Sequence, residues 1–301
     1  MSKPARFVDA HMHLWDLDHL RYPWLSPPFS DQGVNGDVSP IASTYRIGDY
    51  LRELDAWPVG GLVHVEAGAH PDDALAETRW LETSLSGMGL PFALVAFAPL
   101  NATDLERRLA LHCEHPHVRG IRHIANWHPD PHYSYTSADL LQDAAWRRGV
   151  ALLASYGLSL DLQIYPGQMA DAAALAARHP DVQIALNHAG MPIKGDNAGL
   201  RTWRDGVRLL AARPNVVCKL SGFGIMDHVW TAESIRPLIL EAIDAFGVDR
   251  CMFASDLPTD RLHASADRVL SAYLSICSQF SHHERDALFA SNALRFYRPD
   301  P

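Results

Sequence analysis

The chain has 301 residues, of which 48% are hydrophobic and 20% are charged, and its formal net charge is -9 at pH 7. This length and composition predict a globular protein large enough for a single α/β barrel. The acidic balance and the lack of Lys/Arg runs argue against a surface for nucleic acid or anionic membranes, and no apolar stretch is long enough to span a bilayer. Four cysteines without a CxxC pair and an N-terminus without an apolar signal core predict a reduced, cytoplasmic protein.

Short apolar runs alternate with longer amphipathic segments along the chain, which is typical of βα units around a parallel sheet. The expected strands cover residues 7–13, 61–67, 92–98, 120–124, 159–164, 183–188, 216–221 and 251–255. The expected helices cover residues 72–86, 104–115, 139–156, 169–178, 200–212, 234–246, 265–279 and 283–290. Eight strands joined by helices predict a (β/α)8 TIM barrel in one domain over residues 1–301. No Gly-rich phosphate fingerprint follows the first strand, which counts against a Rossmann fold.

The segment from Asp16 to Asp49 is rich in Pro and Gly and has no clear periodicity. It is too long for an ordinary connection between a strand and a helix. We therefore expect a long loop after the first strand that lies over the mouth of the barrel.

Polar side chains close the expected strands. The first strand ends in Asp9, Ala10, His11, Met12 and His13, and strict alternation would place Asp9 and both histidines on one face. The other strands bring further polar residues: His64, Glu66, Arg122, His123, Asp161, Gln163, Asn187, His188, Lys219 and Asp256. Burying an unpaired charge is costly, so a strand covered by helices has little reason to carry one. Because barrel enzymes hold their catalytic groups at the carboxyl ends of the strands, these residues predict one shared site.

Several of these segments together resemble the amidohydrolase superfamily, in particular its amidohydrolase 2 branch. The resemblance is closest to a group that includes fuconolactonases, sulfomuconolactonases and pyrone-dicarboxylate lactonases. It is carried by DAHMHLWD at residues 9–16, YPWL at 22–25, VRGIRH at 118–123, LNHAG at 186–190, KLSG at 219–222 and MFASD at 252–256. These motifs span nearly the whole chain, but they do not name a substrate.

The resemblance implies a hydrolase that opens a cyclic ester, namely a lactone of a sugar acid or of an aromatic-catabolism intermediate. The substrate would be a small anionic or polyhydroxylated molecule. Asp256 would take a proton from water and return it to the leaving alkoxide. His188 would polarise the scissile carbonyl, and Arg122 would pair with a substrate carboxylate. Each of these residues also has a possible structural role without catalysis. Asp256 could cap a helix N-terminus, His188 could be a hydrogen-bonded core histidine, and Arg122 could form a structural ion pair with Glu66 or Asp161.

The same resemblance implies one divalent ion, with zinc as the first choice, held by His11, His13 and Asp256. Mononuclear sites need three or more protein ligands, and this set supplies three. The group also contains lactonases described as metal-independent, in which case the two histidines would contact substrate directly. Both alternatives stay open at the level of the sequence.

Six further residues are expected to contact substrate: Glu66, Gln163, Lys219, Tyr22, Trp24 and His123. A structural salt bridge explains Lys219 equally well, and a tryptophan packed on the rim of the barrel explains Trp24 equally well. The carboxylated lysine of binuclear family members has no counterpart, since Arg122 and Gln163 stand at those strand ends.

Three rival functions remain for the same scaffold. Gln163 stands where related decarboxylases carry a metal-binding histidine, which counts against a metal-dependent decarboxylase. A lactone isomerase would use similar groups, and a sugar-acid-binding protein would need no catalysis. The sequence leaves a homo-oligomer open and does not decide the oligomeric state.

Overall fold

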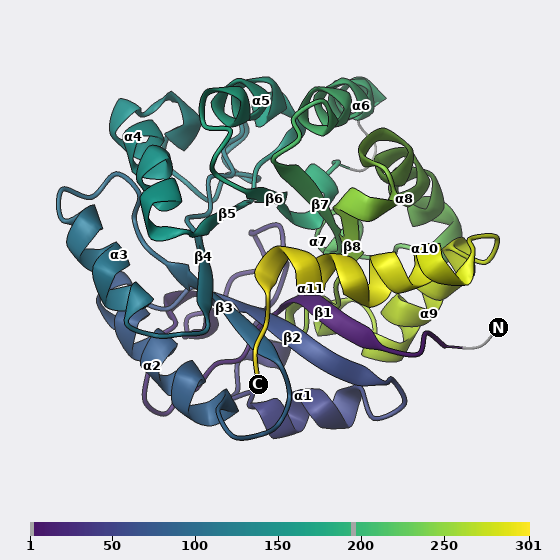
Figure 1. The fold of residues 1–301 in the computed structure, drawn as a ribbon, viewed down its shortest axis with the longest axis horizontal. Helices are drawn as coiled ribbons and strands as arrows, with labels where there is room; N and C mark the ends of the chain where they lie inside the picture. The colour runs from purple at the N-terminus through teal and green to yellow at the C-terminus, as the bar shows by residue number, and fades with distance from the viewer. Residues whose placement is uncertain (1–2, 194–196) are drawn as a thin grey trace.

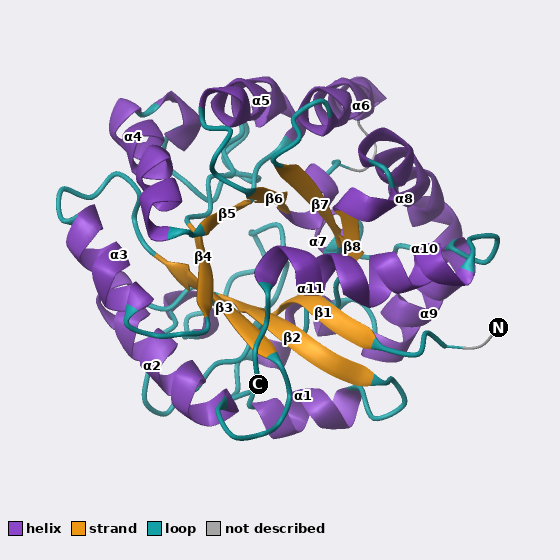
Figure 2. Cartoon of the chain, in the orientation of Figure 1, coloured by secondary structure: helices purple, strands orange, loops and turns teal. Residues whose placement is uncertain are grey.

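The computed structural model describes residues 3–193 and 197–301, and its centre is a barrel of eight parallel strands (Figures 1 and 2). Each strand pairs with the next one along the chain, in the order β1 to β8. The strands are β1 Phe7–Met12, β2 Val59–Val65, β3 Phe92–Phe97, β4 Val118–Arg122, β5 Ser159–Leu162, β6 Ile184–Leu186, β7 Val216–Leu220 and β8 Cys251–Phe253. The prediction of a single (β/α)8 TIM barrel is thereby confirmed.

Helices surround the barrel as an outer ring (Figure 2). They are α1 Ile47–Glu53, α2 Ala74–Leu85, α3 Leu105–Cys113, α4 Ala144–Leu153, α5 Met169–Arg178, α6 Asn197–Ala211, α7 Phe223–Met226, α8 Ala232–Phe246, α9 Ala266–Ile276, α10 His282–Asp286 and α11 Asn292–Tyr297. Within the described ranges, no helix is long and apolar enough to cross a membrane.

The strands are apolar because both of their faces are covered. One large cluster of buried side chains packs between the strands and the ring of helices. A second cluster of mostly small residues, including Val8, Val63 and Ala185, packs with Tyr297 of α11. Figure 1 shows α11 lying across the end of the barrel that faces the viewer. One end of the barrel is thus closed by α11, which leaves the opposite end for a site.

The seam between the first and last strands is closed by hydrogen bonds just beyond β8. The backbone N–H of Asp256 donates to His11 O at 2.9 Å, and that of His13 donates to Leu257 O at 2.7 Å. The buried carboxylate of Asp9 in β1 also links the two strands, because it accepts hydrogen bonds from Ser255, just after β8, and from Tyr50 of α1. The pairing of β1 with β2 is irregular between Asp9 and Met12. Strict alternation therefore fails there, and Asp9 does not join the two histidines.

Several element boundaries differ from the sequence-based expectation. The sixth and eighth strands end early because His188 and Asp256 adopt positive φ angles of 52° and 55°, which strand geometry excludes. The expected helix over residues 139–156 is interrupted at Asp143, whose side chain accepts from the N–H of Ala145 and begins α4 there. The last expected helix, 283–290, is α10 followed by a π-helical turn. Helices α1, α7 and α11 were not predicted.

The long segment after β1 does lie over the barrel mouth. A bridge between Trp15 and Tyr45 ties its two ends together, with backbone N–O distances of 3.0 and 2.9 Å. The short helical turn Pro23–Leu25 brings Trp24 inward, and its indole Nε1 donates to Ala67 O at 2.7 Å. The predicted loop ended at Asp49, whereas α1 already begins at Ile47.

Candidate active site

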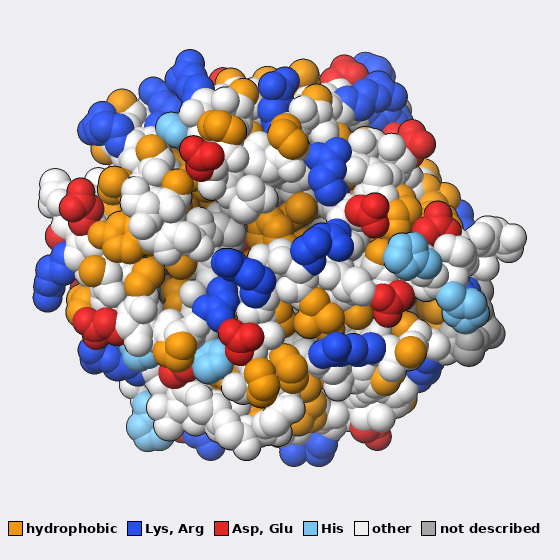
Figure 3. Space-filling model, in the orientation of Figure 1, with side chains coloured by type: hydrophobic (Ala, Val, Ile, Leu, Met, Phe, Trp, Pro, Cys, Tyr) orange, Lys and Arg blue, Asp and Glu red, His pale blue; other side chains and the backbone are white. Residues whose placement is uncertain are grey.

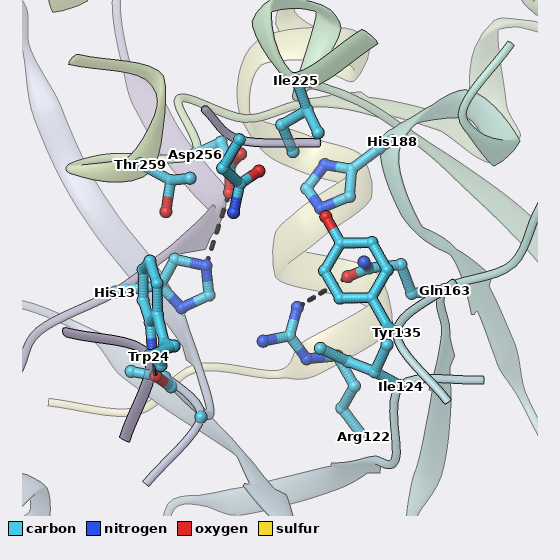
Figure 4. Close-up of a pocket in the computed structure, with 13 residues that line it drawn as sticks. His13, Trp24, Arg122, Ile124, Tyr135, Gln163, His188, Ile225, Asp256 and Thr259 are labelled. Atoms are coloured by element: carbon cyan, nitrogen blue, oxygen red, sulfur yellow. Dashed lines mark hydrogen bonds and ion pairs between the residues drawn. The ribbon is translucent and has the colours of Figure 1, made fainter. Parts of the chain in front are cut away.

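A cavity of about 240 Å³ opens at the carboxyl ends of the strands (Figure 4). It lies at the end of the barrel opposite α11, where barrel enzymes carry their catalytic groups. Its walls combine apolar and polar side chains: His13, Trp24, Asn35, Ala67, Gly68, Arg122, Ile124, Tyr135, Gln163, His188, Ile225, Asp256 and Thr259. Such a volume suits a small molecule of one ring rather than a polymer.

His11, His13 and Asp256 form a compact group in the wall of this cavity, with one possible ligand atom from each within 4.8 Å of the others. The Nε2 atoms of His11 and His13 lie 3.6 and 3.4 Å from Asp256 Oδ1. His13 Nδ1 contacts Val65 O at 2.7 Å, which leaves Nε2 directed at the carboxylate. Burial lowers the pKa of His13 to about 3, so its imidazole is neutral, as a metal ligand must be.

Two buried polar atoms of this group have no hydrogen-bond partner among the described residues: His11 Nδ1 and Asp256 Oδ2. Burial raises the pKa of Asp256, while His188, Arg122 and Lys219 act in the opposite direction. A carboxylate with a free oxygen facing a small cavity can serve as a base, as a metal ligand, or as both. The residues present therefore fit a divalent ion bound by two imidazoles and one carboxylate.

His188 is held against this group by an unusual backbone. It has a φ of 52° and its Nδ1 lies 3.0 Å from Ser221 Oγ, which leaves Nε2 available to the cavity. A side chain at Gly222 would place its Cβ 2.4 Å from His188 Nδ1, so glycine is needed there. The ring centroid of His188 lies 4.6 Å from that of His11. Burial lowers the pKa of His188 to about 4, and the imidazole is accordingly neutral near pH 7.

Arg122 faces the cavity, and side chains at the ends of neighbouring strands hold its guanidinium in place. Its Nε donates to Glu66 Oε1 at 2.7 Å, and its Nη1 donates to Gln163 Oε1 at 3.1 Å. The ion pair with Glu66 that the sequence offered as a structural alternative is present, yet Arg122 and Gln163 also line the cavity. Glu66 itself is not among the lining residues, and its carboxylate holds the Arg122 guanidinium in place.

Besides Glu66, three more residues expected to contact substrate lie outside the cavity wall. Lys219 is buried, and its Nζ pairs with Asp161 Oδ2 at 2.5 Å. The Tyr22 hydroxyl donates to Glu77 Oε1 at 3.0 Å behind the mouth loop. The ring of His123 accepts the N–H of Leu100 at 3.2 Å. Of the other eight residues expected to form the site, all but Glu66 line the cavity or belong to the His-His-Asp group: His11, His13, Trp24, Arg122, Gln163, His188 and Asp256.

Seven residues that line the cavity were not predicted from the sequence: Asn35, Ala67, Gly68, Ile124, Tyr135, Ile225 and Thr259. Ala67, Gly68 and Ile124 lie beside the predicted strand-end residues Glu66 and His123. Asn35 and Tyr135 come from irregular loops, where no periodicity points to a function. Thr259 lies three residues after Asp256, so the proximity to a strand-end carboxylate was the one available signal. Ile225 belongs to the short helix α7, which apolar patterning alone does not separate from the core.

These features define the chain as a TIM-barrel enzyme with a His-His-Asp group at the mouth of its barrel. It belongs to the amidohydrolase family, whose model, described as "Amidohydrolase", matches residues 8–298. It is therefore a hydrolase of the family that the sequence motifs resemble.

Known relatives cover almost the whole chain. An uncharacterized protein, y4mH, of Sinorhizobium fredii is 41% identical over 97% of this chain and 98% of its own length. An L-fucono-1,5-lactonase of Burkholderia multivorans is 33% identical over 98% of this chain and 97% of its own length. The crystal structure of an amidohydrolase from Burkholderia multivorans with bound zinc has a TM-score of 0.81 and 30% identity, and the match covers 98% of this chain and 100% of the other.

Proposed function

We propose that the protein is a lactonase that opens the cyclic ester of a sugar acid by adding water. The observation that carries this proposal is Asp256, a buried carboxylate in the wall of a cavity of about 240 Å³, with one oxygen free of hydrogen bonds among the described residues. The identity of 33% to an L-fucono-1,5-lactonase supports the same reaction class. A sugar-acid lactone is a compact single ring that suits such a volume.

In the proposed mechanism the free oxygen of Asp256 takes a proton from a water molecule in the cavity. The water oxygen bonds to the lactone carbonyl carbon, and the carbonyl electron pair moves onto its oxygen. His188 and Arg122 stabilise the negative charge on that oxygen. The ring C–O bond then breaks, and Asp256 returns its proton to the departing alkoxide.

We propose that His11, His13 and Asp256 hold one divalent ion, with zinc as the expected metal. The zinc-bound amidohydrolase structure and the unpartnered, buried Oδ2 of Asp256 support this assignment. A bound zinc would supply Lewis-acid polarisation of the carbonyl and a more acidic water. Gln163 is engaged with Arg122 rather than with this group, which favours hydrolysis over metal-dependent decarboxylation.

The test is a pH-indicator hydrolysis screen over sugar-acid and muconolactone-type lactones. Purified protein is compared before chelation, after chelation and after readdition of zinc, with Asp256→Asn beside it. We expect turnover of at least one lactone and a loss of about 1,000-fold or more in Asp256→Asn, the scale of a removed general base with its charge. Wild-type rates in Asp256→Asn would refute the mechanism. Incorporation of oxygen from labelled water separates hydrolysis from isomerisation.

A further inference from the structure

Tyr135 reaches the cavity from the long connection that follows β4. Its backbone N–H donates to Asn126 O at 3.1 Å, and the hydroxyl of Thr136 donates to the same carbonyl oxygen at 3.1 Å. These two hydrogen bonds fold the segment between residues 126 and 136 back on itself. The loop thereby presents Tyr135 at the mouth of the barrel, where it lines the cavity.

The phenol of Tyr135 points into the cavity rather than away from it. Figure 4 shows its hydroxyl directed toward His188, across the cavity from His13. The hydroxyl has no hydrogen-bond partner among the residues that the structure describes, although the charges of Asp256 and Arg122 both act on it. Burial and the Asp256 charge raise the pKa of Tyr135, so the phenol keeps its proton and remains a donor.

The Tyr135 hydroxyl has no partner among the described residues and lies beside His188. It can therefore donate a hydrogen bond to the negative charge that develops on the substrate carbonyl oxygen during the reaction. Donors fixed in advance at the position of a developing oxyanion contribute strongly to acyl-transfer catalysis. Tyr135 is 37% exposed as a residue, so it forms part of the wall next to solvent while its hydroxyl end faces the reacting groups.

We propose that Tyr135 is a catalytic residue whose hydroxyl donates a hydrogen bond to the carbonyl oxygen of the bound ester. This inference rests on the proposed lactonase function and adds a residue to it. When water attacks, the carbonyl electron pair moves onto the oxygen and the hydrogen bond from Tyr135 strengthens. Its proton is not transferred, because the proton that leaves the water goes to Asp256 and from there to the alkoxide.

The experiment compares Tyr135→Phe with wild type on the lactone that wild type hydrolyses fastest in the screen. Tyr133→Phe is the matched control, because Tyr133 lies on the same loop, packs 6.2 Å from the Tyr165 ring and does not line the cavity. We expect kcat of Tyr135→Phe to fall by about 10- to 100-fold with KM changed by less than about threefold, since the lost donor acts in the transition state. Melting temperatures should match, because the hydroxyl has no partner in the described protein.

Each outcome decides something. A fall in kcat for Tyr135→Phe with unchanged Tyr133→Phe supports the assignment. An active wild type with Tyr135→Phe within about twofold of it in kcat overturns the assignment alone and leaves the lactonase function standing. A rise in KM without a fall in kcat also overturns it, since that pattern belongs to ground-state binding. A wild type inactive on every lactone overturns the proposed function and this inference with it.

Discussion

Lys219 and Asp161 form an ion pair inside the barrel, with 2.5 Å between Nζ and Oδ2 and both side chains fully buried. Tyr297 donates to Asp161 Oδ1 at 2.7 Å, and Asn187 donates to Oδ2 at 3.1 Å. The pair is thus hydrogen-bonded from the closed end of the barrel and from the sixth strand end. The positive charge of Lys219 lies beneath the site, where together with burial it keeps the pKa of His11 below its usual range.

Breaking this pair should destabilise the fold far more than it changes substrate binding. Lys219→Met leaves Asp161 as an uncompensated buried charge, and we expect the free energy of unfolding to fall by about 3–5 kcal/mol. The double variant Lys219→Met with Asp161→Leu should recover part of that loss, since no charge is then left unpaired. Urea unfolding measures both. Equal stability of the single variant and wild type would contradict a buried ion pair.

Gly68→Ala should disturb the mouth of the cavity through Trp24. Gly68 has a φ of +71°, and an added Cβ would lie 2.9 Å from Trp24 Nε1, which donates to Ala67 O. We expect KM to rise severalfold as Trp24 moves, and the free energy of unfolding to fall by about 1–2 kcal/mol. Steady-state kinetics and urea unfolding are the measurements.

Gly87→Ala is the matched control for that change. Gly87 has a similar φ of +77°, but an added Cβ would meet nothing within 4 Å. It therefore carries the backbone strain without the clash, and it should lose stability with no change in KM. If both variants showed the same KM, Trp24 would have no part in substrate binding.

The sequence predicts the barrel well because buried parallel strands are short apolar runs. Errors in the exact boundaries of these runs do not change their number or their order along the chain. Prediction fails at His188 and Asp256, where the backbone turns to positive φ, because neither residue type signals that conformation as glycine does. A position near the end of a strand also does not show whether a side chain reaches the cavity or is buried beneath it. Lys219 is a polar residue near a strand end just as Arg122 is, yet only the packed barrel shows that Lys219 is paired below the cavity.

Cavity-lining residues that come from loops could not be predicted from the sequence for a different reason. Tyr135 and Asn35 reach the cavity from irregular loops, and the Tyr135 loop is held by local hydrogen bonds such as those from Tyr135 N–H and the Thr136 hydroxyl to Asn126 O. Such contacts leave no periodic pattern in the chain. The resemblance to a family identified the His-His-Asp group, but it did not identify these lining residues.

Glu77 should make the stability of the fold depend on pH. Its buried carboxyl accepts from the Tyr22 hydroxyl, and burial together with the charge of Glu66 raises its pKa from 4.5 to about 8. Between these values the folded chain binds a proton that the unfolded chain releases, so the free energy of unfolding falls as pH rises from 5 to 8. Glu77→Gln keeps the shape and removes this titration, which should flatten the dependence by as much as about 4 kcal/mol.

The measurement for Glu77 is urea unfolding at several pH values between 5 and 8. Glu106→Gln is the control, because Glu106 lies exposed on α3 and its replacement should leave the pH dependence of wild type intact. Parallel curves for wild type and Glu77→Gln would show that Glu77 titrates in the folded chain as it does in the unfolded one.

Metal binding provides a test of the His-His-Asp group that does not depend on activity. Equilibrium dialysis of the chelated protein against zinc should give about one ion per chain, and zinc should raise the melting temperature. Mutation of a residue that hydrogen-bonds to a metal ligand commonly weakens metal affinity by about 10- to 100-fold. His13→Ala removes a ligand itself, so it should weaken zinc binding by more than about 100-fold. His283→Ala is the control, because His283 is an exposed histidine on α10, away from the cavity. Equal zinc affinity and equal thermal stabilisation in His13→Ala and wild type would remove His13 from the ligand set and leave it as a substrate contact.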